Sequence, residues 1–546
     1  AEIKESANRI ITTGLKPWNV WEALGVYKPK WLDTIDLIEP NPAVMQGLKV
    51  LNGRLHGPWM QELPYPHDKV LTDEEKDFVV KYCRNDLDAT ERLYLALQEP
   101  LDIRAKVSAD LGMDVRSKSD TQMGTSIIKK RIEDASGKRI PRTDPQFGIG
   151  FRYQIPGFIK FETPQLQAIL ERIRDHEFTT KADGKVDLPK WLSDEKIVIG
   201  PSTFQMGIGG LHSTESNRSV IADSHNAIVS VDVASYYPAS ILSLGLYPHA
   251  VGKEFLTVYR GIRDARIAAK KAGDKVFDKT YKICLNGTFG VLGSRYSFMY
   301  APHLLIAVTL TGQLALLMLI ERAFLKGIPS ISANTDGVEF LCPRGLYAGL
   351  TGDRINPCAL AEVTEGWERD TGYVLEGVEY TALYNQSVNS YIALKADGTH
   401  KRKGPIANPW NKDKADFDPR GQMMKNPQMT ICSDAVLYFL KHGTPIEQTI
   451  RECRDVREFI TVVNATGGAD WRGEYLGKVV RYYWSTDGDP IIKMKPHPST
   501  GNRPKVSKTD GCRPLMTLPD DYTVPADLDY ARYIKEAESI LSLIHI

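Results

Sequence analysis

Two aspartates occupy positions where a carboxylate would need a cation. Asp232 ends the apolar run 227–231, which predicts a buried strand, and a helix start with Pro238 near its first turn follows. A carboxylate at the tip of a core strand is costly to bury unless a cation or a donor meets it. We therefore expect Asp232 to share a metal ion with a second carboxylate elsewhere in the chain.

Asp336 is the candidate for that second carboxylate. The sequence Asn-Thr-Asp-Gly at 334–337 lies between apolar residues, which predicts a hairpin turn between two strands. Asp336 would then project from a tight turn. An ordinary hairpin without chemistry is the alternative, because Asp-Gly is common in turns.

Cationic residues cluster between these two aspartates in the chain. Residues 256–272 and 278–289 predict two helices joined by a short loop, and Arg263, Arg266 and Lys270 fall on one face of the first. Several cations on one patch suit a triphosphate, whereas a solvated basic hairpin is the alternative. Glycines inside the second helix, in the segment 286–290, indicate that something approaches its backbone closely.

Two further segments contain motifs that indicate a functional site less specifically. Tyr82 and Asp86 lie four residues apart on a predicted helix over 72–97, which Thr72 and Glu75 open as a capping box. Either the pair is part of a nuclease site or it is a solvated helix surface. The glycine cluster 207–212 is either a plain turn or a backbone that approaches a ligand.

The elements that must position these residues form several domains. The chain has 546 residues and a net charge of +1, with strands predicted at 373–376, 379–383 and 390–394 and helices at 303–326, 429–442 and 446–463. The basic, aromatic stretch 477–484 either packs on a nucleic-acid backbone or builds a strand. The helix predicted over 72–97 has an apolar side formed by Phe78, Val79, Leu87, Leu93 and Leu95.

Charge is distributed unevenly. Residues 255–295 hold nine Lys or Arg against three Asp or Glu, and residues 401–513 hold twenty against thirteen. Two basic stretches around a neutral, carboxylate-bearing middle would suit a polyanion groove, or they are two solvated helical faces. The seven scattered cysteines, with no CxxC pair, disfavour a zinc site or a disulfide framework and fit a reducing cytosol.

A membrane location is not expected. Residues 304–320 lack charge, but the run is short, contains Thr309, Thr311 and Gln313, and continues into Glu321 and Arg322, which favours a buried core helix. The chain begins at Ala1 without an initiator Met and ends without a natural stop signal, so we expect a fragment at both ends. We give no weight to the last few residues, which resemble translated adapter sequence.

The ordered set of motifs resembles family B DNA polymerases. Motif A is similar to residues 232–238 (Asp-Val-Ala-Ser-Tyr-Tyr-Pro), motif B to 282–290 (Lys-x-x-x-Asn-Gly-x-Phe-Gly) and motif C to 334–337 (Asn-Thr-Asp-Gly). Tyr82 and Asp86 resemble exonuclease motif III of the same family. The resemblance covers nearly the whole chain and is nearest to the compact polymerases of tailed bacteriophages.

The resemblance implies roles for individual residues. Asp232, Asp336 and the Val233 carbonyl would hold two Mg²⁺ ions, with Mn²⁺ as an alternative. The nucleotide would be bound by Ser235, Tyr236, Tyr237, Arg266, Lys270, Lys282 and Asn286, with Lys282 also protonating pyrophosphate and Tyr237 rejecting a 2′-hydroxyl. The primer and template would be held by Gly209, Gly210, Tyr391, Lys401, Lys403 and Gly404.

Three positions depart from the family pattern. Asn334 stands where motif C usually has its first Asp, and we expect activity to survive because the second Asp is the firmer ligand in the family. Tyr236 stands where Leu is common. Gly287 and Phe289 replace the usual Ser and Tyr of motif B, and Phe289 keeps the ring without the hydroxyl.

The implied fold class is a multidomain α+β right hand with palm, fingers and thumb, and a partial ribonuclease H-like 3′–5′ exonuclease domain. The expected divisions are an exonuclease remnant over 1–105, a connecting region over 106–225, palm over 226–254 and 296–400, fingers over 255–295, and thumb over 401–546. No Asp-x-Glu strand precedes residue 72, so the nuclease is expected to be incomplete.

The implied activity is template-directed DNA synthesis in the cytoplasm, host cytoplasm if the protein is viral. The expected protein is a monomer that takes primer–template DNA and deoxynucleoside triphosphates, with replication accessory proteins as candidate partners. Two rivals stay open. One is a DNA-binding fragment that does no chemistry, motivated by Asn334; the other is a working exonuclease, which Tyr82 and Asp86 alone cannot support.

Overall fold

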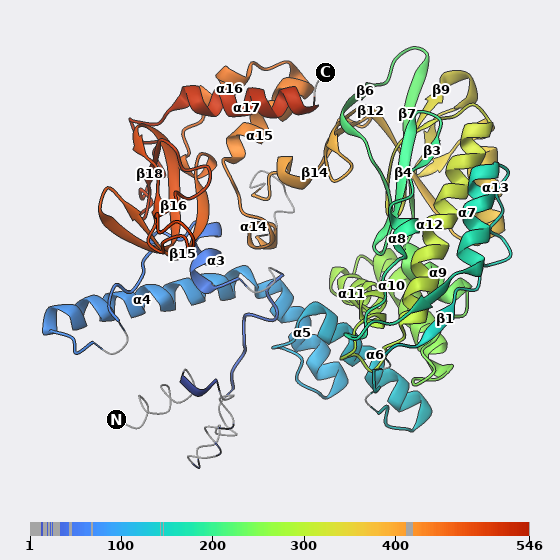
Figure 1. Ribbon diagram of the computed structural model, residues 1–546, viewed down its shortest axis with the longest axis horizontal. Coiled ribbons are helices and arrows are strands. Elements are labelled where there is room, and N and C mark those ends of the chain that lie inside the picture. Colours follow the sequence, from blue (N-terminus) through green and yellow to red (C-terminus); the bar gives the residue numbers. More distant parts are fainter. Residues whose placement is uncertain are drawn as a thin grey trace.

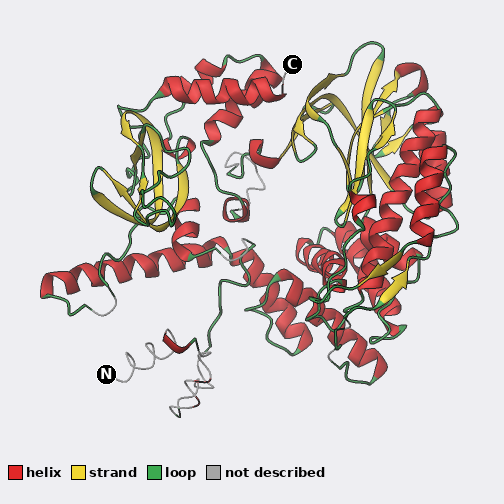
Figure 2. Cartoon of the chain, in the orientation of Figure 1, coloured by secondary structure: helices red, strands yellow, loops and turns green. Residues whose placement is uncertain are grey.

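The computed structural model describes residues 12–14, 19, 22, 25, 33–42, 46–66, 69–141, 143–145, 147–410 and 419–544. Helices and strands alternate in blocks along the chain, so the fold is mixed α and β (Figure 2). The expected fragment ends, at residue 1 and at residues 545–546, lie outside the described residues.

The element that carries both aspartates is a ten-stranded sheet in which every pairing is antiparallel. Its order is β14-β13-β12-β7-β9-β8-β5-β4-β3, with β6 beside β12. The strands are β3 (Ile197–Ile199), β4 (Ser202–Gly207), β5 (Gly210–Ser213), β6 (Ser216–Ile221), β7 (Asn226–Val233), β8 (Ser330–Asn334), β9 (Gly337–Pro343), β12 (Leu375–Ser387), β13 (Ser390–Lys395) and β14 (His400–Lys403). The buried strand and the hairpin predicted around the two aspartates are confirmed as β7 and as β8 with β9.

One face of this sheet is buried under helices. Val229, Val231 and Val233 of β7 pack with α12 (Pro302–Leu325), α7 (Pro164–Asp175) and α13 (Ala359–Thr371). Because successive residues of a strand point to opposite faces, Asp232 lies on the other face. Below, this other face is called the carboxylate face, and it carries Asp232, Glu339, Tyr391 and Lys401.

α12 is the one described helix long and apolar enough to span a membrane by length and composition, and 83 % of its most apolar window is buried inside the protein. It forms the middle of the core against the sheet, with Leu314, Leu317 and Ile320 fully buried. The prediction of a buried core helix is therefore confirmed.

The predicted basic helical hairpin is present. It consists of α10 (Glu254–Ala272) and α11 (Lys275–Leu292), and it packs on α6 (Asp120–Ser136) and on α9 (Tyr236–Ser243). A Cβ on Gly287 would lie 3.7 Å from Thr121, and one on Gly124 would lie 3.0 Å from Cys284. The contact at Gly287 has ordinary van der Waals length, and a Cβ on Gly290 would meet nothing within 4 Å, so the close approach predicted at the glycines of α11 is not made by any described residue.

The described N-terminal part is helical, with α3 (Leu48–Arg54), α4 (Asp73–Ala96) and α5 (Gln98–Leu111). The capping box of Thr72 and Glu75 is confirmed. The apolar side predicted for this helix is wrong in part, because Leu87 and Leu95 are 70 % and 62 % exposed whereas Leu93 is buried. A small sheet pairs β1 (Gly150–Arg152) with β2 (Glu177–Thr179), and α8 (Lys190–Ser193) precedes β3.

The C-terminal part differs from its mainly helical prediction. Helices α14 (Arg420–Met424), α15 (Thr430–His442), α16 (Ile446–Glu452) and α17 (Tyr530–Ile544) flank a four-stranded sheet of β15 (Thr461–Trp471), β16 (Glu474–Asp489), β17 (Ile492–Lys493) and β18 (Cys512–Pro514). The helix predicted over 446–463 ends early, because residues from 461 pair with β16 instead. The stretch 477–484 builds a strand, with Arg481, Tyr482 and Trp484 buried. The two strands predicted over 373–383 form the single strand β12.

The ribbon closes a ring in Figure 1. The large sheet and the small sheet lie on opposite sides, joined below by α4, α5 and α6 and approached above by α15, α16 and α17. The ring closes where α17 contacts β6 and β12, and Ser219 Oγ donates to the Ile544 carbonyl at 2.5 Å. The expected division at 225 coincides with the start of β7, whereas the one at 105 falls inside α5.

Candidate active site

Asp232 and Asp336 lie at the same end of two paired strands. Asp232 is paired with Gly337, and a Cβ on that glycine would lie 2.1 Å from Asp232 Oδ1, so the missing side chain gives the carboxylate its space. The Val233 amide donates to the Asp336 carbonyl at 2.7 Å, which fixes the turn against β7. Burial, and then the negative charge of Asp232, raise the pKa of Asp336.

This pair fits a divalent cation. The repulsion between two neighbouring carboxylates is relieved when a cation neutralises them. No group of three His, Cys, Asp or Glu side chains in the described ranges could hold a metal ion, so a cation here would have two carboxylates as its side-chain ligands. Mg²⁺ is commonly held by one or two carboxylates together with waters and substrate phosphates.

A third acid, Glu339, lies beneath the pair. It is 8 % exposed on β9, two residues beyond Gly337 on the carboxylate face, and Ser230 Oγ donates to its Oε1 at 3.3 Å. Burial and Asp232 raise the pKa of Glu339 to about 8. The positive charge of Lys401 acts in the opposite direction on this pKa and on that of Asp336.

Tyr237 forms one wall beside the carboxylates. Its ring stacks on Phe289 of α11 with centroids 4.0 Å apart and planes at 25°, and its hydroxyl donates to the Gly209 carbonyl at 2.5 Å. Burial, and then Asp336, raise the pKa of Tyr237 to about 12. The tyrosine is thus contacted by Phe289 of α11 on one side and by the glycine cluster on the other.

The glycine cluster packs directly on the Asp336 turn. Gly210 has a φ of +146°, and a Cβ there would lie 3.0 Å from Thr335 Cγ2 and 3.1 Å from Thr335 Cα. The Thr335 amide donates to the Leu211 carbonyl at 2.8 Å. The cluster therefore makes a close approach, and its partner is the protein's own hairpin.

α12 holds this cluster from below. Gln313 Oε1 accepts from the Gly207 amide at 2.9 Å, and Thr309 Oγ1 donates to the Ile208 carbonyl at 3.3 Å. The Tyr236 hydroxyl donates to the Gly312 carbonyl, and its ring is buried against that helix. The side chain of Tyr236 therefore points into the core, and the structure does not bring it to the nucleotide-binding group expected from the resemblance.

The basic and polar side chains of the helical hairpin differ in their contacts and in their exposure to solvent. Arg266 joins three elements, because it donates to Ser235 Oγ and to Asp278 Oδ1, each at 3.0 Å. Ser235 itself has a φ of +51° at the start of α9. Lys270, Lys282 and Asn286 are exposed. Lys282, Asn286 and Phe289 recur at helical spacing, so they share the face of α11 that reaches Tyr237.

Of the residues expected to hold the primer and template, Gly209 and Gly210 lie at the β4–β5 turn, Tyr391 lies on β13, Lys401 and Lys403 lie on β14, and Gly404 follows β14 directly. Tyr391 is paired with Lys403, and Lys401 Nζ lies 5.9 Å from the Tyr391 ring centroid. A Cβ on Gly404 would lie 2.3 Å from the Asn389 carbonyl, so this position packs against the β12–β13 turn. The positive charges of Lys403 and Lys401 act against the rise in the pKa of Asp336.

Tyr82 and Asp86 lie apart from this site, on α4. The Tyr82 hydroxyl accepts from Lys49 Nζ at 2.6 Å, and Lys49 pairs with Glu62 at 2.5 Å. Asp86 and Lys49 line the same small pocket beside α3. Among the described residues, no group of three or more His, Cys, Asp or Glu side chains that could hold a metal ion surrounds Asp86.

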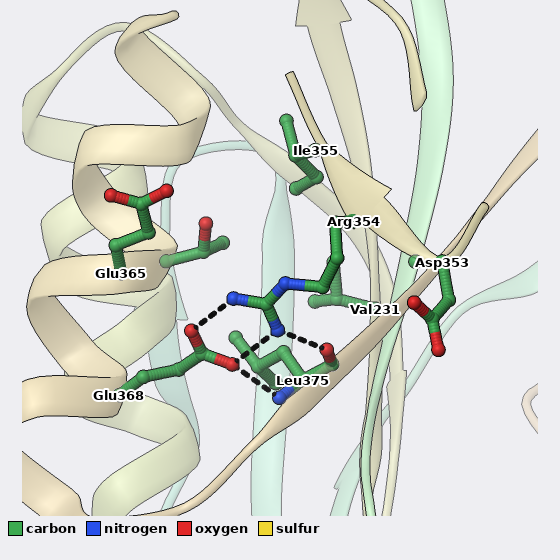
Figure 3. Close-up of a pocket in the computed structure, with 9 residues that line it drawn as sticks. Val231, Asp353, Arg354, Ile355, Glu365, Glu368 and Leu375 are labelled. Atoms are coloured by element: carbon green, nitrogen blue, oxygen red, sulfur yellow. Dashed lines mark hydrogen bonds and ion pairs between the residues drawn. The ribbon is translucent and has the colours of Figure 1, made fainter. Parts of the chain in front are cut away.

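An ion pair supports the strand beside Asp232. Arg354 contacts Glu368 of α13 through two N–H groups at 2.8 and 2.6 Å, and it donates to the Leu375 carbonyl at 2.9 Å. Glu368 also accepts from the Leu375 amide at 2.6 Å (Figure 3). This clamp fixes the first residue of β12, which pairs with Val233.

Three features of the site were not predicted from the sequence: the acid Glu339, the stacking of Phe289 on Tyr237, and the contact of Asn389. The alternation of β9 was the available signal for Glu339, because the second residue after Gly337 shares its face. No local pattern indicates Asn389, which receives a hydrogen bond from Asn334 across 55 residues of chain.

No protein-family model matches the sequence, and no curated protein matches it. Among solved structures, the chain is similar to the family B DNA polymerase from the hyperthermophilic archaeon Pyrobaculum calidifontis. The TM-score is 0.40 and the sequence identity 12 %, over 96 % of this chain and 68 % of that one.

Proposed function

We propose that the chain carries out template-directed DNA synthesis, adding deoxynucleotides to a primer 3′-end by two-metal nucleotidyl transfer. The observation that carries the proposal is that Asp232 lies opposite Gly337, the residue after Asp336, so both aspartates lie at the same end of two paired strands, next to a basic helical hairpin. The order of the motifs along the chain supports a family B polymerase of the type found in tailed bacteriophages. Under this proposal residues 226–254 and 296–400 are the palm, 255–295 the fingers and 401–546 the thumb.

Each residue of the site would have a separate role. Asp232 and Asp336, with the Val233 carbonyl, would hold Mg²⁺, which when bound supplies activation of the primer hydroxyl and neutralisation of phosphate charge. Lys270 and Lys282 would bind the triphosphate, and Lys282 would give a proton to the leaving pyrophosphate. Arg266 would hold the fingers to Ser235, and Tyr237 would lie under the sugar.

The test is primer extension by the full chain with Mg²⁺ and deoxynucleotides. Asp232→Asn and Asp336→Asn should each lower extension by at least about 100-fold, because each removes charge that the metal needs. Glu365→Gln is the matched control, since it removes an exposed carboxylate of α13 behind the sheet and should leave extension unchanged. Extension that survives both aspartate changes would remove these residues from the site.

One outcome would favour the rival function. Salt-sensitive binding of primer–template DNA, without extension under any divalent cation, would identify a DNA-binding chain that does no chemistry. Degradation of single strands that Asp86→Asn abolishes would instead identify a working nuclease.

A further inference from the structure

The side chain of Asn334 is fully engaged at the end of β8. Its Nδ2 donates to the Val388 carbonyl and to Asn389 Oδ1, each at 3.0 Å. Its Oδ1 accepts from Thr335 Oγ1 at 3.1 Å. The residue therefore joins the turn that carries Asp336 to the turn between β12 and β13.

These contacts require an amide at position 334. The Val388 carbonyl can only accept a hydrogen bond, so the atom facing it must carry a proton. An ionised carboxylate has no donor and would place a negative charge against the Val388 carbonyl oxygen. The Asp that motif C usually has at this position would be incompatible with the contact.

A second contact joins the same elements. Glu215 Oε1 accepts from Ser332 Oγ of β8 at 2.5 Å and from Asn385 Nδ2 of β12 at 3.0 Å. Ser332 and Asn334 are two residues apart on β8, so both point to the same side of the strand. β12 is separated from β8 by β7 and β9 in the sheet order, and its far end must therefore curl back over the carboxylate face to meet β8.

The hairpin held in this way bears the primer-side residues. Tyr391 follows the turn directly, and Gly404 packs against Asn389 and Ser390 on its other side. A path of contacts thus runs from Gly404 through the β12–β13 turn and Asn334 to the turn that carries Asp336.

We propose that Asn334 is a positioning residue, which latches the β12–β13 hairpin to the Asp336 turn and so sets the carboxylate relative to the primer-side residues. On this view Asn334 is not a lost metal ligand. The kinetic consequence rests on the proposed DNA synthesis, whereas the latch itself does not.

The latch is tested first without activity, by amide hydrogen exchange of the full chain in peptides that cover 330–340 and 384–394. Asn334→Asp and Asn334→Ala should raise exchange at both turns together. Asn389→Asp should resemble the parent, because a carboxylate still accepts from the Asn334 amide. Asn334→Asp combined with Asn389→Asp should exchange fastest, since two carboxylates then face each other.

If the variants at position 334 do not fold, Asn389→Ala provides a second test of the latch. It removes one exposed acceptor and should cause a smaller rise at both turns. Exchange that changes at only one turn in these variants, or at neither, would overturn the latch.

The kinetic test measures kcat and the KM for deoxynucleotide in primer extension. Asn334→Asp should lower kcat by about 10- to 100-fold, the cost of a small misplacement of a reacting group, with KM nearly unchanged. A rise in extension with Asn334→Asp would instead show a vacant ligand position and overturn the proposal. If the parent does not extend primers, the proposed function fails and the exchange result alone decides the latch.

Discussion

Tyr237 has two separable features, its ring and its hydroxyl. The ring stacks on Phe289, and the hydroxyl is hydrogen-bonded to the Gly209 carbonyl rather than left free. If the ring excludes a 2′-hydroxyl by bulk, the sugar preference depends on the ring and not on the hydroxyl.

Tyr237→Ala should therefore raise ribonucleotide incorporation by roughly 10- to 100-fold, the range that one added group in a pocket is worth. Tyr237→Phe is the matched control, which keeps the ring and loses only the bond to Gly209. Competition between ribo- and deoxynucleotides in primer extension measures both. A sugar preference that moves equally in the two variants would contradict exclusion by bulk.

Glu339 should make stability depend on pH. Its folded pKa of about 8 lies above its ordinary value of 4.5, so the folded state keeps a proton that the unfolded state releases. Its contribution to the free energy of unfolding is therefore full below pH 4.5 and is lost as pH rises to about 8, by at most about 1.4 kcal/mol per pH unit.

The Glu339→Gln variant cannot ionise at this position. Its free energy of unfolding, minus that of the parent, should therefore increase from pH 4.5 to about 8. Urea unfolding in the presence of a chelator measures this difference, because a bound cation would favour the ionised carboxylate. Glu365→Gln, at an exposed position, should show no such trend. Parallel pH curves for the parent and Glu339→Gln would rule out a buried neutral Glu339.

At the scale of elements, the candidate site depends on three supporting contacts beneath Asp232 and Asp336. α12 holds the β4–β5 hairpin through Gln313, that hairpin packs on the Asp336 turn through Gly210, and the Arg354–Glu368 clamp fixes β12. None of these residues is a candidate ligand or nucleophile.

Gly210→Ala should therefore disturb the site without touching a carboxylate. The positive φ and the approach of Thr335 leave no room for a Cβ, with a cost of about 1 to 3 kcal/mol for the strained backbone. Gly157→Ala, at an exposed turn position outside the site, is the control, because its Cβ would meet nothing within 4 Å. Thermal unfolding and primer extension should both fall for Gly210→Ala, and an equal effect of the two changes would argue against this packing.

The whole molecule is held as a ring by contacts between distant segments. Arg481 of β16 is fully buried and donates to the carbonyls of Gly57, Pro58, Leu515 and Met516. The Met60 amide donates to the Met516 carbonyl, and the Leu518 amide to that of Pro58. The guanidinium of Arg481, hydrogen-bonded to four backbone carbonyls, therefore joins the described N-terminal segment to the small sheet.

Arg481→Met should lower the free energy of unfolding by about 2 to 4 kcal/mol, because it removes the guanidinium donors of the Gly57 and Leu515 carbonyls, whereas the Pro58 and Met516 carbonyls keep backbone donors. Lys478→Met on the same strand removes an exposed charge and should change stability little. Chemical unfolding of the full chain measures both. Equal stability of the two variants would show that the carbonyls find other donors.

The sequence by itself determined the elements of the site where short-range patterns are strong. An apolar run ending in Asp232 and the turn residues 334–337 predicted β7 and the β8–β9 hairpin, because alternation and turn chemistry are local. The helical hairpin and the capping box of α4 followed from helical spacing in the same way. The small C-terminal sheet did not, because the strand beginning at Thr461 is stabilised by pairing with β16 rather than by its own pattern.

Only the tertiary structure decided which side chains meet. Tyr236 and Tyr237 are neighbours in the sequence, yet one is buried against α12 and the other lines the site. Asn334 looked like a lost carboxylate when compared with a motif, whereas its partners at 388 and 389 make the amide necessary. Such contacts join segments more than fifty residues apart, and the curl of the sheet that brings them together has no signature in either segment alone.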